Sequence, residues 1–166
     1  MENTVKDTIR TRKIAFLATD GVDDDALNAM KKSLVSDGAM VKLVATKHGT
    51  IKTAKGAEVK VDETFLTTAS VLFDAVYVPG GKASIDALSL EMDALHFVNE
   101  AFKHCKAISA TGEGVDFIKN LTFAGKDEND KAVILGKTAK ETAKPFAAAI
   151  AQHRNWERET ARKVPA

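Results

Sequence analysis

The sequence predicts an α/β protein in which a mainly parallel, doubly wound sheet is covered by helices on both faces. Two continuous apolar runs, Ile14–Thr19 and Ala107–Ala110, end in glycine-containing turns, as buried parallel strands do. Segments with apolar residues at helical spacing separate the runs, so strands and helices alternate along the chain. Alternation of this kind builds right-handed βαβ units, in which consecutive strands lie parallel to one another.

The remaining strands are predicted from apolar runs that are bounded by turn residues. They are expected at Met40–Thr46, Asp74–Gly81 and Ala132–Gly136, and the glycine-punctuated segment Gly49–Val61 is expected to form a small β excursion. With the two runs above, these strands and the helices between them predict a flavodoxin-like three-layer α/β/α sandwich.

The helices are predicted from apolar spacing. Leu27, Met30 and Leu34 follow the turn residues Asp20–Asp25 and predict a helix that ends at Gly38. Leu95, Val98 and Phe102 mark one face of a later helix. An Ala-rich helix is expected around Lys144–Trp156.

The length and composition indicate one domain that acts without nucleic acid or membrane. The 166 residues suit a single core, which we expect at residues 13–166, with the polar residues 1–12 as a linker or lead-in. The formal net charge of +1 produces no overall electrostatic attraction to nucleic acid or to an anionic membrane. No uncharged apolar run is long enough to span a bilayer. The polar start lacks the apolar stretch of a signal peptide, and the single Cys105 allows no intrachain disulfide, so a cytoplasmic location is expected.

Three turns should meet at the carboxyl edge of the sheet, where ligands bind in folds of this class: Asp20–Asp25, Pro79–Ala83 and Thr111–Gly114. Backbone N–H groups after a strand and before a helix can hold an oxyanion or phosphate, so Gly80, Gly81 and Lys82 are candidate binding residues, with Thr111 beside them. The alternative is a tight turn that simply requires glycine. The segment lacks both the dinucleotide and the phosphate-loop glycine patterns.

The acidic cluster after the first strand has two interpretations. Asp20, Asp23, Asp24 and Asp25 could form a metal site or a catalytic carboxylate pair. They could instead cap the following helix and oppose the positive end of its dipole. We favour the cap, because no other acidic segment is placed to complete a metal shell, and we predict no metal site. A receiver-like phosphoacceptor domain would also use the cluster, but the central strand ends in Pro79-Gly80-Gly81 where an acceptor aspartate is needed.

No nucleophile with a base is evident. Cys105 and His104 are sequence neighbours, and Cys105 precedes its strand, at the edge opposite the converging turns, so a buried structural cysteine is expected. Ser109 and Thr111 would need a histidine base, and no histidine lies in the three turns. The other histidines show no metal-ligand spacing: His48, His96 and His153.

Two of these segments resemble the ThiJ/PfpI branch of the class I glutamine-amidotransferase-like fold. They are "VPGGKASIDAL" at residues 78–88 and "KAISATGEGVDFI" at residues 106–118. Active members carry a Cys-His-Gly elbow in the second motif, which falls on Gly112, Glu113 and Gly114 here, and an acidic partner that falls on Asp23. The resemblance therefore implies a vestigial site at Asp23, Gly112 and Glu113, with no catalytic residue.

The sequence is more similar to the C-terminal domain of large-subunit haem catalases, a ThiJ/PfpI-like unit without the elbow cysteine. The similarity rests on "RKIAFLATDGVDDDAL" at 12–27, "NEAFKHCKAISATGEGVDF" at 99–117 and the ending "AQHRNWERETARKVPA", and it covers residues 11–166. It implies a parent enzyme that dismutates hydrogen peroxide in the oxidative stress response, with haem in the catalase core. No haem or other cofactor is expected in this chain, whose only tyrosine, Tyr77, lies inside a predicted strand.

The resemblance implies a non-catalytic accessory domain that stabilises subunit assembly. Its partners would be the catalase core and the neighbouring subunits of a homotetramer, and a chaperone-like role of the domain is implied as well. The sequence leaves open whether the isolated chain also forms a homo-oligomer. The alternative is a stand-alone ThiJ/PfpI-family protein that binds a small molecule, or that retains hydrolase or glyoxalase-type activity with Asp23 or Glu113 as general base.

Overall fold

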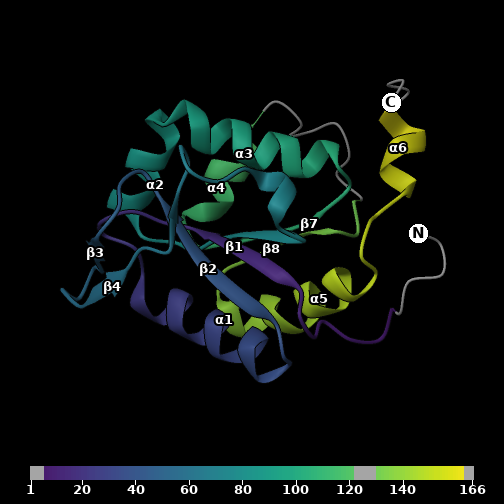
Figure 1. The fold of residues 1–166 in the computed structure, drawn as a ribbon, viewed down its shortest axis with the longest axis horizontal. Coiled ribbons are helices and arrows are strands. Elements are labelled where there is room, and N and C mark those ends of the chain that lie inside the picture. Colours follow the sequence, from purple (N-terminus) through teal and green to yellow (C-terminus); the bar gives the residue numbers. More distant parts are fainter. Residues whose placement is uncertain (1–5, 122–129, 163–166) are drawn as a thin grey trace.

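The computed structural model describes residues 6–121 and 130–162, and these form a three-layer sandwich around one parallel sheet (Figure 1). The six strands lie in the order β5-β2-β1-β6-β7-β8, and every neighbouring pair is parallel. Their bounds are Lys13–Leu17 (β1), Met40–Ala45 (β2), Glu63–Thr64 (β5), Ala75–Val78 (β6), Ala107–Thr111 (β7) and Val133–Gly136 (β8). The predicted fold class is confirmed.

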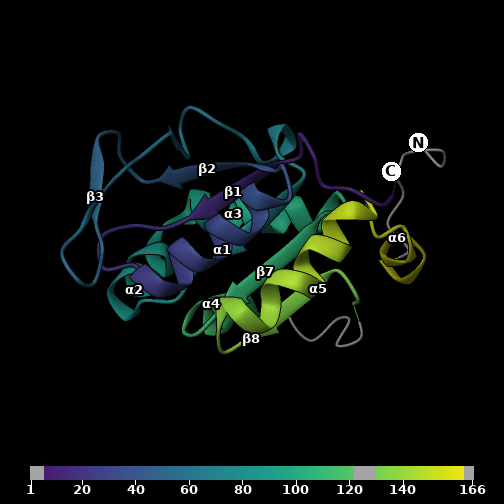
Figure 2. The same ribbon diagram turned by 90° about the horizontal axis from the view of Figure 1, so that it is seen from below.

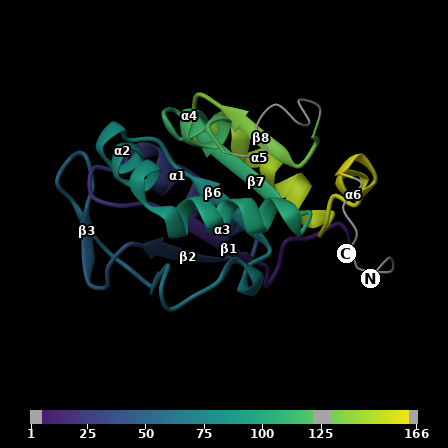
Figure 3. The same ribbon diagram turned by 90° about the horizontal axis from the view of Figure 1, so that it is seen from above.

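Helices cover both faces of the sheet, as Figures 2 and 3 show from opposite sides. One face carries the helices α1 and α5, and the other carries α3 and α4, with α2 toward one end. The bounds are Asp24–Ser36 (α1), Lys82–Leu90 (α2), Met92–Lys103 (α3), Gly114–Lys119 (α4), Ala139–Ala151 (α5) and Glu157–Arg162 (α6). A short 3₁₀ helix, η1, spans Ser70–Leu72, and an antiparallel hairpin joins β3 (Thr50–Lys52) to β4 (Glu58–Lys60), which confirms the predicted excursion.

The central strands are buried on both faces, because a helix layer lies on each. Every residue of β6 and β7 is buried, and so are four of the five residues of β1. Alternate residues of one strand therefore enter two different cores. In β1, Phe16 packs with the α1 and α5 side and Leu17 with the α3 side. Two-sided burial explains why these strands read as continuous apolar runs.

The strand order reverses between β1 and β6, and this reversal positions the candidate site. From β1 the chain moves outward to β2 and β5, and then returns to β6 on the other side of β1. The helices that follow β1 and β6 therefore lie on opposite faces of the sheet, and folds of this class bind ligands at the carboxyl edge beside such a reversal.

The helix near the end of the chain starts earlier than the sequence suggested. The prediction placed it around Lys144–Trp156, but α5 runs from Ala139 to Ala151 and includes Pro145. The Thr138 hydroxyl caps it by accepting a hydrogen bond from the Glu141 N–H at 3.3 Å. Burial of its apolar face against the sheet offsets the hydrogen bond that an interior proline removes.

The last residues of the expected lead-in pack against the domain. Ile9 is buried in the core beneath α1 and α5, and the Thr11 N–H donates to the Gly38 carbonyl at 2.9 Å. Ordered packing therefore begins before Lys13. None of the helices in residues 6–121 and 130–162 combines the length and apolar character needed to cross a membrane.

A buried ammonium group lies at the amino edge of the sheet. The side chain of Lys106 is 1% exposed, and its Nζ donates to the Ser70 carbonyl at 2.5 Å. The pKa of Lys106 is lowered to about 8, mainly by burial and in part by the nearby Arg154, while Asp74 opposes the shift. The charged form is thus less favourable in the folded protein than in the unfolded chain.

This shift predicts that Lys106 makes the domain more stable as the pH rises from 8 to 10.5. In that window the unfolded chain still binds the proton that the folded domain has released, so unfolding becomes less favourable. Relative to Lys106→Met, the free energy of unfolding of the wild type should increase by up to about 3 kcal/mol across the window. Urea unfolding of both proteins at several pH values measures this, and parallel pH profiles would contradict it.

Candidate functional site

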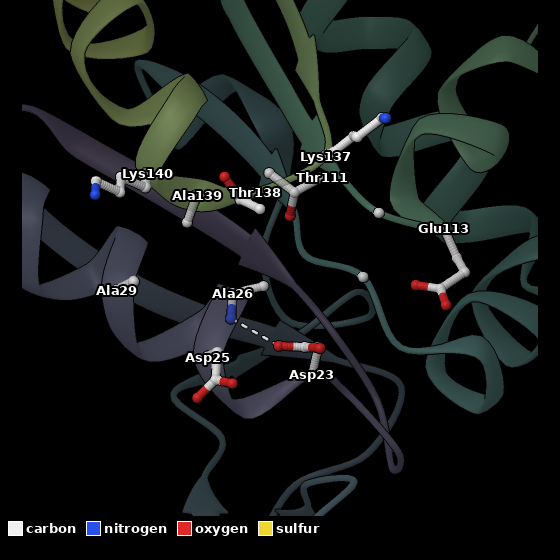
Figure 4. Close-up of a pocket in the computed structure, with 12 residues that line it drawn as sticks. Asp23, Asp25, Ala26, Ala29, Thr111, Glu113, Lys137, Thr138, Ala139 and Lys140 are labelled. Carbon is white, nitrogen blue, oxygen red and sulfur yellow. Dashed lines mark hydrogen bonds between the residues drawn. The ribbon is translucent and has the colours of Figure 1, made fainter.

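A cleft of about 340 Å³ lies at the carboxyl edge of the sheet (Figure 4). It brings together residues from the turn after β1, the turn after β6 and the β7–α4 corner, as predicted for the three converging turns. Of the predicted residues, Asp23, Gly80, Thr111, Gly112 and Glu113 line it, whereas Gly81 and Lys82 do not. Its size is within the range of small-molecule sites.

Asp23 serves the first turn of α1. Its carboxylate accepts a hydrogen bond from the Ala26 N–H at 2.7 Å, as the dashed line in Figure 4 marks. Asp24 and Asp25 fall in the same turn, where they oppose the positive end of the helix dipole. The predicted cap is confirmed for Asp23, whereas Asp20 lies outside the helix and its carboxylate accepts a hydrogen bond from the Lys52 N–H at 2.8 Å.

The glycine turn after β6 already holds a carboxylate of the protein. The Gly81 N–H donates to the Glu113 Oε2 at 3.0 Å. This bond, with the N–H of Glu113 itself, lowers the pKa of the Glu113 carboxyl group below its usual value. Lys82 turns to its own helix and pairs with Asp86 at 2.8 Å. An external oxyanion would therefore have to displace Glu113 from Gly81.

Close approach of neighbouring backbone segments explains why glycine occupies positions 81 and 114. Gly81 has a φ of 115°, and a Cβ there would lie 2.6 Å from the Asp23 nitrogen and 2.8 Å from the Val22 Cα. A Cβ on Gly114 would collide with the Val78 carbonyl oxygen. The backbones of the turns after β1, β6 and β7 thus pack directly against one another, with no room between them for a Cβ atom.

Gly112, at the corner between β7 and α4, differs from these glycines. It adopts a left-handed φ of 54°, but a Cβ built on it would meet only the Gly80 Cα, at 3.5 Å. The corner therefore has space for a side chain that the sequence does not supply. The strand, strained turn and helix that display a reactive side chain in many α/β enzymes are all present.

Two buried hydroxyl groups below the cleft, those of Tyr77 and Thr111, are hydrogen-bonded to each other. The Tyr77 hydroxyl lies 2.7 Å from the Thr111 Oγ1, and it also donates to the Ala26 carbonyl at 3.3 Å. Burial raises the pKa of Tyr77 well above its usual value. Both hydroxyls are therefore neutral and structurally engaged, and they connect the floor of the cleft to α1.

The sequence reasoning missed one wall of the cleft. Lys137, Thr138, Ala139 and Lys140 line it from the start of α5. They were missed because the helix was expected to begin near Lys144. A Thr followed three residues later by Glu141 is a capping-box signal that would have placed the true start.

The remaining candidates lie away from this cleft. Cys105 is buried at the amino end of β7, with its amide bonded to Phe102, which confirms the structural role predicted for it. His48 and His96 are exposed, and His153 hydrogen-bonds Arg12 at 2.9 Å near the amino edge. Within the described ranges, no group of three or more His, Cys, Asp or Glu side chains could hold a metal ion.

Comparison with known proteins identifies the family. Residues 10–160 match the family model described as the C-terminal domain found in long catalases. The chain is 43% identical to catalase HPII of Mycobacterium avium, over 93% of this chain and 24% of that protein. It is 36% identical to catalase HPII of Pseudomonas aeruginosa, over 99% of this chain and 23% of that protein. The chain thus spans about a quarter of the length of the curated relatives it matches.

Solved structures with the same fold include the ThiJ/PfpI domain protein from Brachyspira murdochii. It superposes with a TM-score of 0.72 at 18% identity, over 86% of this chain and 96% of that one. The VC2308 protein superposes equally well at 13% identity, over 90% of this chain and 97% of that one. These likenesses concern the fold. Together with the family match they confirm the resemblance stated from the sequence: the chain belongs to the C-terminal domain family of long catalases, built on a ThiJ/PfpI fold.

Proposed function

We propose that this chain is a non-catalytic accessory domain that stabilises the subunit assembly of a long catalase. The observation that carries the proposal is the chemistry of the cleft. Its corner residue, Gly112, has no side chain, although a side chain would fit there. The two nearby carboxylates that could act as bases are engaged, since Asp23 caps α1 and Glu113 holds the Gly81 N–H.

In this proposal Gly112 stands where active ThiJ/PfpI members have their nucleophile. The depressed pKa of Glu113 further argues against a role as a general base, because a carboxylate of low proton affinity accepts a proton poorly near neutral pH. Peroxide dismutation and the haem that it requires would belong to the part of the long polypeptide before this domain. The domain itself would contribute buried contact area to the assembled enzyme.

The experiment is to truncate the full-length protein immediately before Arg10 of this chain. We expect the truncated enzyme to keep its activity per haem and to dissociate into smaller species at a lower guanidinium concentration than the full-length enzyme. Analytical ultracentrifugation across a denaturant series measures this. Identical dissociation curves for both proteins would contradict the proposal.

A second candidate function is small-molecule binding in the cleft, which the position of the cleft at the strand-order reversal favours. Lys137 and Lys140 on its rim would suit a carboxylate or phosphate. A thermal-shift series with phosphate and small carboxylates tests it, with Lys137→Gln/Lys140→Gln as the variant. Gly81→Val is unsuitable, because its side chain would disrupt the backbone contacts described above. No shift with any anion, or an equal shift in the variant, would reject this site.

A further inference from the structure

A side-chain contact at the amino edge of the sheet joins two distant parts of the chain. Arg12 immediately precedes β1, and His153 follows α5, 141 positions later. The Arg12 Nη1 lies 2.9 Å from the His153 Nδ1. The segment that enters β1 and the segment that leaves α5 run close together there in both Figure 1 and Figure 2. This contact therefore ties the entering segment to the leaving segment.

The chemistry of the contact requires an imidazole without a proton on Nδ1. A guanidinium group has only N–H donors, so Arg12 donates and the His153 Nδ1 accepts. A neutral imidazole has one such acceptor nitrogen, whereas both nitrogens of a protonated imidazole are donors. Protonation of His153 therefore removes the hydrogen bond and sets two cations against each other.

Asp74 offers the protonated imidazole another partner. The Asp74 Oδ1 lies 3.5 Å from the Arg12 Nη1 and 3.9 Å from the His153 Nδ1. Of these two neighbours, only Arg12 is a cation while His153 is neutral. A proton on Nδ1 would direct an N–H donor and a positive charge at the same carboxylate. Arg12 and His153 would then compete for one oxygen atom.

The charged groups around His153 favour its neutral form. Arg154 is the next residue along the leaving segment, and Lys106, at the start of β7, lies close to Arg154 and Asp74. The imidazole is only 14% exposed. Burial, Arg154 and Arg12 lower the pKa of His153 below its usual value, and Asp74 opposes this shift. At neutral pH the imidazole is therefore uncharged and holds Arg12.

The backbone on each side of the contact is held by other hydrogen bonds. The His153 N–H donates to the Ile150 carbonyl at 2.9 Å, and the Arg12 carbonyl accepts from the Met40 N–H at 2.8 Å. Neither bond uses a group that protonation of the imidazole changes. The side chains can therefore exchange partners while the backbone around them stays in place.

We propose that Arg12, His153 and Asp74 form a pH-sensitive switch at the amino edge of the sheet. In the neutral state, Arg12 bridges the His153 imidazole and the Asp74 carboxylate. In the acidic state, a proton from solvent binds the His153 Nδ1, the imidazolium pairs with Asp74, and Arg12 is released. The entering and leaving segments then lose their link through Arg12. This inference goes beyond the proposed function and does not depend on it.

Nuclear magnetic resonance of the 166-residue protein, titrated from pH 8 to pH 5, tests the switch. The nitrogen signals of His153 should show an unprotonated Nδ1 at pH 8 and an imidazolium at pH 5, with a midpoint below 6.5. The Arg12 Nε–H signal should broaden at the same midpoint, because the released guanidinium exchanges faster with water. A proton on Nδ1 at pH 8, or an Arg12 signal that does not change with pH, would overturn the proposal.

His153→Asn is the matched variant. Asparagine tolerates the left-handed φ of 70° at this position, and its side-chain oxygen accepts a hydrogen bond from Arg12 without titrating. The Arg12 signal of this variant should stay constant across the titration. His48→Asn is the control, because His48 is exposed and follows β2 at the opposite edge of the sheet. The control should keep the pH dependence, and a pH-dependent Arg12 signal in His153→Asn would contradict the assignment.

Asp74→Asn tests the exchange of partners. The amide still offers an oxygen to the Lys13 N–H, which donates to the carboxylate at 2.9 Å in the wild type, but it carries no negative charge. The pKa of His153 should therefore fall further below its wild-type value. A pKa that is unchanged in this variant would show that the imidazolium does not pair with Asp74, and the proposed exchange would be wrong.

Stability measurements supply an independent readout. Because folding lowers the pKa of His153, the unfolded chain takes up the proton first as the pH falls below 6.5, and unfolding becomes more favourable. In urea unfolding between pH 6.5 and pH 5, the wild type should therefore lose more stability than His153→Asn. Equal losses in the two proteins would count against the switch, because His153 would then bind protons alike in the folded and unfolded states.

Discussion

Replacing Arg158 with methionine should lower the free energy of unfolding by about 3–5 kcal/mol, because it leaves a buried carboxylate without its cation. Arg158 and Asp130 are each 1% exposed, and the Arg158 Nε donates to the Asp130 Oδ2 at 2.5 Å. The guanidinium also donates to the carbonyls of Phe102 and Lys106, at 2.8 and 3.1 Å. The substitution therefore breaks several contacts at once.

The expected effect reaches the end of the chain as well as the core. The Asp130 carboxylate also accepts from the Asn155 amide at 2.8 Å, and the Arg158 guanidinium lies 4.1 Å above the Phe102 ring. Arg158 belongs to α6, so these bonds attach that helix to the amino edge of the sheet. Without them, α6 should detach before the rest of the domain unfolds.

Urea unfolding followed by circular dichroism gives the size of the effect. The matched control is Arg158→Met/Asp130→Asn, which removes both charges. It should recover part of the lost stability, because no charge stays buried without a partner. A double variant that is less stable than Arg158→Met alone would show that desolvation of Asp130 is not the cause.

The second large effect is expected at Gly81, where alanine should cost about 4 kcal/mol or more or prevent folding altogether. The added Cβ would lie 2.6 Å from the Asp23 nitrogen, at a φ of 115° that side chains rarely adopt. Relief would require the turns after β1 and β6 to move apart. The Asp23 N–H would then lose its 2.8 Å bond to the Gly80 carbonyl.

Gly112→Ala is the matched control, since it makes the same chemical change at the same edge of the sheet. Alanine at the left-handed φ of 54° should cost about 1 kcal/mol of backbone strain. Its Cβ would have no close neighbour. Yield and thermal unfolding of the two variants separate backbone collision from backbone strain. Equal losses of stability would show that conformation alone governs both positions.

The order of strands and helices could be predicted because strands buried on both faces are continuous apolar runs, and helices buried on one face have apolar residues at helical spacing. The apolar runs at 14–19 and 107–110 correspond to β1 and β7, and helical spacing at Leu27, Met30 and Leu34 corresponds to the buried face of α1. The convergence of three turns followed from topology alone. The capping role of Asp23 followed from local preference, which acts within one turn of helix.

The parts that could not be predicted depend on contacts between distant residues. The two-residue strand β5 has no pattern of its own and exists because it pairs with β2. The partnership of Glu113 with Gly81 spans 32 positions, so the candidate anion loop gave no sign that the protein itself fills it. Lys106 and Arg158 look like surface residues in the sequence, and only the fold shows that both are buried.

The placement of the two ring systems that absorb near 280 nm gives the domain separate optical reporters. The sequence has one tryptophan and one tyrosine. Trp156 is 45% exposed and adjoins α6, whereas Tyr77 is fully buried in the central sheet. Tryptophan emission should therefore follow release of the chain end, and the tyrosine signal should follow disruption of the sheet. A lag between the two signals during denaturation would resolve two stages of unfolding without any added label.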